Sequence, residues 1–156
     1  MYNKLLKQIH KKLLKKGKTI AIAESCTGGG LSSLLTSLAG SSGYFILGVV
    51  TYSNKSKEMI LNIPAKTLNN YGAVSRQVAK LMAQNIRKKT NTDFGLSVTG
   101  IAGPSGATIQ KPVGTVFIAL ANRNKTLYRE FLLPGKREKI IKKSIQKALD
   151  LLYTQI

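Results

Sequence analysis

Residues 20–30 read IAIAESCTGGG, and the rest of the chain can be placed around them. Four small or branched apolar residues run into a polar pair, a cysteine, a threonine and three glycines. An amphipathic segment, residues 31–38, follows directly. This order is typical of a buried strand, a tight turn and the start of a helix. The N–H groups of a helix N-terminus attract negative charge, so the turn is a candidate site for a bound anion or a developing oxyanion.

Ser25 is the candidate nucleophile of this turn, and the backbone N–H groups of Thr27 and Gly28 are candidate donors to an oxyanion. Two other interpretations stay open, namely a glycine-rich turn that only binds phosphate and one that only reverses the chain. Cys26 is a rival nucleophile, because a thiol at a helix N-terminus can have a lowered pKa. Alternatively, Cys26 is a small buried residue that faces away from the site.

Apolar periodicity and turn residues divide the remaining chain into further elements. The near-continuous apolar and β-branched run at 44–52 predicts a central strand. Helices are predicted over 2–16, from 27 or 28 to near 40, and over 54–61, 65–70, 76–89 and 136–153; strands over 18–23, 44–52, 93–99, 113–121 and 126–133; and a loop over 41–43. We therefore expect an α/β fold, a single three-layer α/β/α domain over residues 1–156 on a mixed, mostly parallel sheet.

Length and composition agree with one globular domain of 156 residues, 43% of them hydrophobic. No apolar run approaches the roughly 20 residues of a membrane span, and the N-terminus lacks the pattern of a secretory signal. The single cysteine excludes an internal disulfide framework. These features predict a cytoplasmic protein without a membrane partner.

The formal net charge of +19 makes nucleic acids, acidic membranes and anionic metabolites possible partners. Thirteen of the 25 basic residues lie in residues 4–18 and 136–147, most of them are lysine, and the basic stretches are not interleaved with aromatic residues. Lysine lacks the planar fork that suits base or bidentate phosphate recognition. We therefore favour a solvated, lysine-rich surface over a dedicated nucleic-acid face.

A nucleophilic serine needs a base, and the candidate bases in this sequence are few. The only histidine is His10, on the first predicted helix, and no cluster of His, Cys, Asp or Glu has the spacing of a metal site. A Ser–Lys pair remains. If the first two strands are parallel, Ser25 and residues 52–57 face one crevice, which makes Lys57 the candidate base. Burial and a cationic neighbourhood would keep Lys57 neutral; the alternative is an ordinary exposed helix lysine.

Five motifs together resemble the CinA C-terminal domain family, whose characterised members are nicotinamide-nucleotide amidases. The similarity covers nearly the whole chain, in order and at family-like spacing. The motifs are Ala23-Glu24-Ser25-Cys26-Thr27-Gly28-Gly29, Val50-Thr51-Tyr52-Ser53-Asn54 with Lys57, Gly72-Ala73-Val74-Ser75, Gly100-Ile101-Ala102-Gly103-Pro104 and Lys111-Pro112-Val113-Gly114-Thr115-Val116.

The resemblance implies deamidation of nicotinamide mononucleotide to nicotinate mononucleotide and ammonia, with no metal and no cofactor. It implies Ser25 as nucleophile, Lys57 as base and Tyr52 as a residue that assists this pair. Thr99 and Arg137 fall where the family carries further active-site residues. The resemblance further implies a stand-alone form that binds a small-molecule nucleotide and self-associates.

Three positions depart from the family pattern. Ile141 stands where a second arginine is usual, Asn85 stands where glycine is frequent, and Gly106-Ala107 replaces paired glycines. Two other functions therefore stay open. One is a catalytically silent nucleotide-binding module, and the other is a basic nucleic-acid accessory protein connected with DNA uptake.

Overall fold

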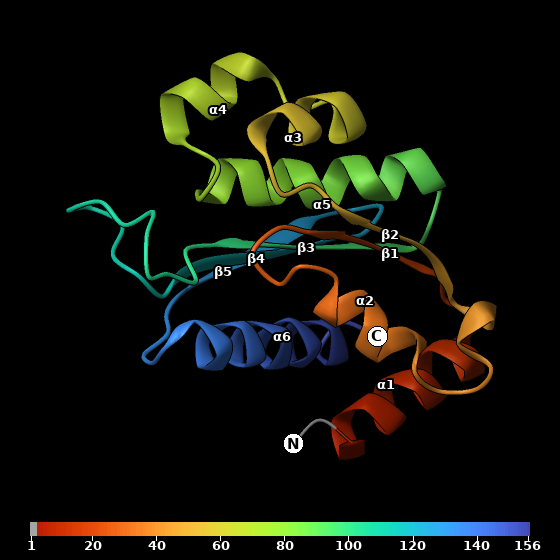
Figure 1. The fold of residues 1–156 in the computed structure, drawn as a ribbon. Coiled ribbons are helices and arrows are strands. Elements are labelled where there is room, and N and C mark those ends of the chain that lie inside the picture. The colour runs from red at the N-terminus through yellow and green to blue at the C-terminus, as the bar shows by residue number, and fades with distance from the viewer. Residues whose placement is uncertain (1–2) are drawn as a thin grey trace.

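A five-stranded mixed sheet forms the centre of the molecule (Figure 1), for which a computed structural model describes residues 3–156. The strands are β1 (Ile20–Glu24), β2 (Phe45–Val50), β3 (Phe94–Gly100), β4 (Thr115–Ala121) and β5 (Thr126–Leu132), in the order β2-β1-β3-β4-β5. β1 pairs in parallel with both β2 and β3, whereas β4 is antiparallel to β3 and to β5. Four of the five strands therefore point the same way, which confirms a mixed, mostly parallel sheet.

Helices cover both faces of this sheet (Figure 1), which confirms the three-layer α/β/α architecture. On one face, α5 lies directly on the strands and α3 and α4 lie outside it; α1, α2 and α6 lie on the other face. The helices are α1 (Asn3–Lys16), α2 (Gly30–Thr36), α3 (Asn54–Leu61), α4 (Ala65–Tyr71), α5 (Arg76–Thr90) and α6 (Arg137–Tyr153).

The alternation of side chains along β1 explains why the two faces pack differently. Ile20 and Ile22 belong to the cluster shared with α1, α2 and α6, whereas Ala21 and Ala23 face the cluster that contains α5 residues. Small residues on the α5 side let the helix approach closely. At Gly95 of β3, a Cβ atom would lie 2.1 Å from the Ala83 carbonyl oxygen, so only glycine fits there.

The larger apolar cluster lies beneath the sheet and joins the two ends of the chain. The α1 stripe, Leu6, Ile9 and Leu13, is buried in it, as the helical periodicity predicts. Lys12 Nζ donates hydrogen bonds to the carbonyl oxygens of Tyr153 and Ile156, which holds α1 against the end of α6. Within residues 3–156, no helix combines the length and apolar character needed to cross a bilayer.

The prediction of a central strand at 44–52 is wrong, because β2 lies at the edge of the sheet. Burial alternates along β2. Ile46 is 51% exposed and Val50 is 47% exposed, whereas Leu47 and Val49 pack against the α5-side cluster. An apolar run indicates a strand, but it does not show whether a neighbouring strand covers the second edge.

The second helix is shorter than predicted, because α2 begins at Gly30 and ends at Thr36. At its start, the Glu24 carboxylate binds the backbone N–H groups of Gly29 and Leu31. After its end, the Ser37 hydroxyl donates to the Leu34 carbonyl oxygen, and polar side chains of this kind compete with helix continuation. The predicted loop at 41–43 is a short 3-10 helix.

Candidate active site

Polar side chains meet where the three parallel strands end. Ser25 follows β1, Thr51 and Tyr52 follow β2, and Thr99 lies one residue before the end of β3. Because β1 pairs in parallel with both neighbours, these three ends share one edge of the sheet. Open α/β sheets bind their ligands at this edge. The crevice anticipated from parallel pairing of the first two strands is thus present.

A serine and a lysine are in contact at this edge. Lys57 Nζ lies 3.1 Å from Ser25 Oγ and 2.6 Å from the Thr51 carbonyl oxygen. The lysine is only 1% exposed, so it is not an ordinary surface lysine of a helix. Its place on α3 is fixed by a capping box in which Ser53 Oγ accepts the Ser56 N–H at 3.0 Å. The structure therefore places a buried amine within hydrogen-bond reach of the candidate nucleophile.

Burial favours the neutral form of this amine. Desolvation lowers the pKa of Lys57 from 10.5 to about 8, and the neighbouring Cys26 opposes the shift. A neutral amine has two N–H donors and one lone pair. One N–H can remain on the Thr51 carbonyl oxygen while the lone pair accepts the Ser25 proton. The site thus has a base whose pKa lies near neutral pH.

Cys26 is poorly suited to act as the nucleophile. Its side chain is 6% exposed and packs into the apolar cluster beneath the sheet. Burial raises the pKa of the Cys26 thiol to about 12, and the charge of Glu24 adds to this rise. A thiol with such a pKa is protonated at neutral pH, and the thiolate is the nucleophilic form. This geometry favours Ser25 over Cys26.

We therefore expect the Cys26 thiol to resist alkylation, because it is buried and protonated at neutral pH. Iodoacetamide at pH 7.5 should leave Cys26 unmodified, as measured by peptide mass spectrometry. Rapid alkylation would instead show an accessible thiolate and would favour Cys26 as the nucleophile.

The serine and lysine open into a cavity of about 270 Å³. Its walls come from the ends of β1, β2 and β3, from the connection between α4 and α5, and from the loop after β3. Arg137, the first residue of α6, closes one side. Lining residues include Ser25, Cys26, Lys57, Tyr52, Thr99 and Gly103.

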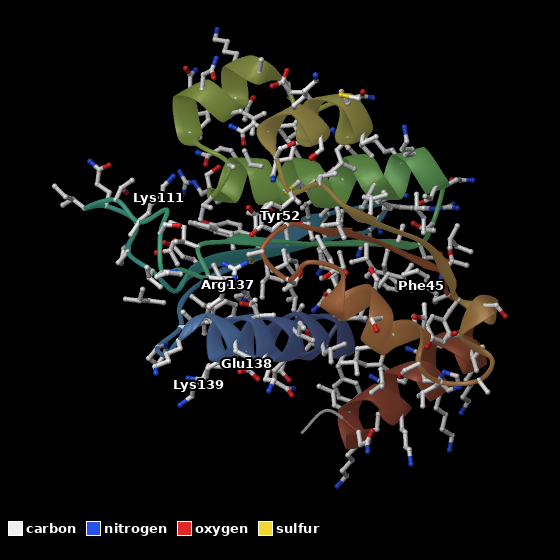
Figure 2. All side chains as sticks on the ribbon, viewed as in Figure 1. Phe45, Tyr52, Lys111, Arg137, Glu138 and Lys139 are labelled. Atoms are coloured by element: carbon white, nitrogen blue, oxygen red, sulfur yellow. The ribbon has the colours of Figure 1, made fainter. Side chains whose placement is uncertain are left out.

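Arg137 bridges two walls of this cavity. Its Nη2 donates to the Tyr52 hydroxyl at 3.0 Å, and its Nη1 donates to the Gly103 carbonyl oxygen at 2.8 Å. Figure 2 shows Tyr52 and Arg137 in the region between the turn after β2 and the start of α6. Residues 52 and 137 are far apart in sequence, so the fold brings them together. Tyr52 thus pairs with Arg137, and it has no hydrogen bond to Ser25 or Lys57 within residues 3–156.

The other residues singled out in the sequence have different surroundings. The Thr99 hydroxyl lines the cavity and donates to the Ala73 carbonyl oxygen at 2.9 Å, which fixes the α4–α5 connection as a wall. Thr27 and Gly28 do not line the cavity. The Gly28 N–H donates to the Ser25 carbonyl oxygen at 3.1 Å, so it is already engaged. Thr27 Oγ1 is buried and lacks a hydrogen-bond partner in the part of the chain that the structure describes.

Two parts of the site were not predicted from the sequence, namely the α4–α5 connection and Glu24. Ala73 and Val74 line the cavity through the α4–α5 connection, and their motif, Gly72-Ala73-Val74-Ser75, gave a signal only as part of the family resemblance. Glu24 is fully buried directly before Ser25. The sequence did contain a signal for Glu24. It is an acid directly before a glycine-rich turn and a helix, and carboxylates stabilise helix N-termini.

Taken together, the fold and the site define an α/β protein with a buried serine–lysine pair at the carboxyl edge of its sheet. The model of the CinA C-terminal domain matches residues 2–156. The chain belongs to this family.

Individual relatives agree with this assignment. A protein of Thermoanaerobacter pseudethanolicus named as competence-damage inducible is 52% identical over 141 residues, which are 90% of this chain and 34% of the relative. A "CinA-like protein" of Leptospira biflexa is 48% identical over 149 residues, 95% of this chain and 36% of the relative. The chain thus spans about a third of the length of the curated relatives that it matches.

Solved structures match over nearly their full length. The competence/damage inducible protein CihA from Agrobacterium tumefaciens has a TM-score of 0.94 at 38% identity, covering 97% of this chain and 93% of that structure. The competence damage-inducible protein A of Klebsiella pneumoniae has a TM-score of 0.94 at 32% identity, covering 97% and 94%. The structural match therefore extends over nearly the whole domain.

Proposed function

We propose that this protein is an amidohydrolase that converts nicotinamide mononucleotide to nicotinate mononucleotide and ammonia through an acyl-enzyme on Ser25. The observation that carries the proposal is the 3.1 Å contact between Lys57 Nζ and Ser25 Oγ inside a cavity. Family membership and the resemblance of the five motifs support the choice of substrate.

Acylation begins when the neutral Lys57 amine takes the Ser25 proton. Ser25 Oγ then attacks the carboxamide carbon of the substrate, whose pyridinium ring withdraws electrons and makes this carbon more electrophilic. The resulting lysine ammonium gives its proton to the departing nitrogen, which leaves as ammonia. A water molecule, deprotonated by Lys57, hydrolyses the ester on Ser25 and restores the serine.

The phosphate of the substrate suits the Arg137 side of the cavity. Arg137 presents a planar guanidinium that can exchange its bond to the Tyr52 hydroxyl for phosphate oxygens. A second cavity of about 490 Å³ adjoins the first and shares Ala102, Gly103 and Arg137 with it. There is thus room beyond Arg137 for the part of a nucleotide that extends from the reacting amide.

Ile141 stands where a second arginine is usual in the family, and this difference does not weaken the proposed phosphate binding by Arg137. Ile141 packs against the apolar cluster beneath the sheet and does not line the cavity. We infer that Arg137 alone supplies the guanidinium of this site. Its bonds to Gly103 and Tyr52 hold it in place without a second arginine.

Arg137→Ala is expected to raise KM for the mononucleotide by about 10- to 100-fold, since charge-assisted hydrogen bonds contribute about 1.5–3 kcal/mol. The turnover number should change by only a few-fold, because Ser25 and Lys57 keep their contact. Lys139→Ala, an exposed cation on the same helix (Figure 2), is the matched control and should change neither constant. An unchanged KM in Arg137→Ala would show that the phosphate binds elsewhere.

Ammonia release by the purified protein tests the proposed function, with nicotinamide mononucleotide and free nicotinamide compared at equal concentration. The proposal predicts release from the mononucleotide and much slower release from nicotinamide, which lacks both the phosphate and the pyridinium charge. Binding of the mononucleotide without ammonia release would instead identify a silent nucleotide-binding module. A steep salt dependence of DNA binding near physiological ionic strength, without turnover, would favour the nucleic-acid alternative.

A further inference from the structure

Glu24 is the one acidic residue of this chain that is completely buried. The sequence has six acids, all within residues 3–156, and only Glu24 is 0% exposed. It is the last residue of β1 and directly precedes Ser25. Burying a carboxylate is unfavourable unless hydrogen bonds compensate. The contacts that compensate here therefore indicate what the residue does.

The Glu24 carboxylate binds the start of α2 with both oxygens. Oε2 accepts the N–H groups of Gly29 at 3.1 Å and Leu31 at 3.0 Å. Oε1 accepts the N–H and the hydroxyl of Ser32 at 2.8 and 2.6 Å. These donors would otherwise have no partner in the first turn of the helix. The four bonds close the chain from residue 24 to residue 32 around Ser25.

Within the described residues, two backbone donors of this closed turn have no acceptor on another residue. Ser25 N–H donates to the Val98 carbonyl oxygen, Gly28 N–H to that of Ser25, and Gly30 N–H to that of Thr27. Glu24 takes the N–H groups of Gly29 and Leu31. Within residues 3–156, no other residue accepts a hydrogen bond from the N–H of Cys26 or Thr27. Of the two residues, Cys26 lines the cavity and Thr27 does not. The Cys26 N–H directly follows the nucleophile, where acyl-transfer sites place an oxyanion donor.

We infer that Glu24 is a positioning residue, which holds the Ser25 turn so that the N–H group of Cys26 can stabilise the oxyanion. Glu24 is not an acid or base in the reaction, since both its oxygens are engaged and it does not line the cavity. The Glu24 carboxylate also binds the N–H groups at the start of α2, which the sequence indicated as a candidate site for a bound anion. The inference rests on the proposed acyl-enzyme chemistry and deepens it.

Glu24→Gln tests this inference, because the amide keeps the size of the carboxylate but has only one acceptor oxygen. The turnover number should fall by about 10²-fold, comparable to loss of an oxyanion donor. KM should stay within about threefold, since Arg137 and Tyr52 are untouched. Glu58→Gln, an exposed acid on α3, is the control and should change neither constant.

A second variant and a pH profile separate positioning from a merely structural role. Ser32→Ala removes one of the four bonds, and we expect a three- to tenfold fall in turnover number with a normal circular-dichroism spectrum. The pH midpoint should stay near that of the wild type in both variants, because burial sets the pKa of Lys57. If both variants kept the wild-type turnover number and lost only thermal stability, Glu24 would be structural and the inference would be wrong.

Labelling of Ser25 by phenylmethylsulfonyl fluoride distinguishes this inference from the choice of substrate. The Ser25 oxygen forms a bond to sulfur, fluoride leaves, and the serine proton passes to Lys57. Slow labelling of Glu24→Gln, measured by mass spectrometry against a fast wild type, supports the inference even if the mononucleotide is not hydrolysed. Equal labelling rates, or a wild type that is neither labelled nor active, would overturn it.

Discussion

Lys57→Met is expected to lower kcat/KM for ammonia release by at least about 10³-fold. In the proposed mechanism, Lys57 acts twice, as the base that activates Ser25 and as the acid that protonates the leaving nitrogen. Proton transfer of this kind typically contributes 10²- to 10⁴-fold. Methionine has a similar length and no titratable group, and the position is 1% exposed. The variant should therefore stay folded while losing its proton-transfer group.

The matched control is Lys55→Met, which removes an exposed lysine from the same helix two residues away. It should keep kcat/KM within about twofold of the wild type. If Lys57→Met kept more than a tenth of the wild-type rate, another group would be the base. If Lys55→Met lost activity to the same degree, the general charge of the surface, and not the buried amine, would matter.

Ser25→Ala is expected to remove turnover almost completely, since loss of a nucleophilic serine costs on the order of 10⁴- to 10⁶-fold. The fold should be unaffected, because the bond from the Ser25 N–H to the Val98 carbonyl oxygen does not involve the side chain. Both the ammonia assay and thermal unfolding should be measured. Ser33→Ala, an exposed serine on α2, is the control and should retain full activity.

Retained turnover in Ser25→Ala would contradict the nucleophile assignment directly. The Cys26→Ala variant then decides which alternative holds. If Cys26→Ala were inactive, the thiol would be the nucleophile despite its burial. If both variants were active, the reaction would not pass through an acyl-enzyme on this turn.

Much of the fold follows from local pattern. The alternation of strands and helices predicts the three layers, and the stripe of Leu6, Ile9 and Leu13 predicts the buried face of α1. The edge position of β2 was not predictable in this way. The exposure of Ile46 and Val50 depends on which strand lies beside β2, and an apolar run contains no information about its neighbours.

The site, like the fold, contains parts that could be predicted from the sequence and parts that could not. The approach of Ser25 and Lys57 follows from parallel strands whose carboxyl ends share an edge. The bond from Arg137 to the Tyr52 hydroxyl joins residues 85 positions apart, and only the docking of α6 beneath the sheet creates it. The hydrogen bond from the Gly28 N–H to the Ser25 carbonyl oxygen could not be predicted either. The geometry of the turn, and not the residue type, determines where a backbone donor points.

The central claim is that a neutral Lys57 amine activates Ser25, and the pH dependence of kcat/KM for ammonia release tests it most directly. The proposed mechanism requires the deprotonated lysine, whose pKa is lowered to about 8 by burial. We predict that kcat/KM rises about tenfold per pH unit below this value, is half-maximal near pH 8 and is level above it. A profile that is flat from about pH 6.5 to 9.5, or one that falls across this range, would contradict the account.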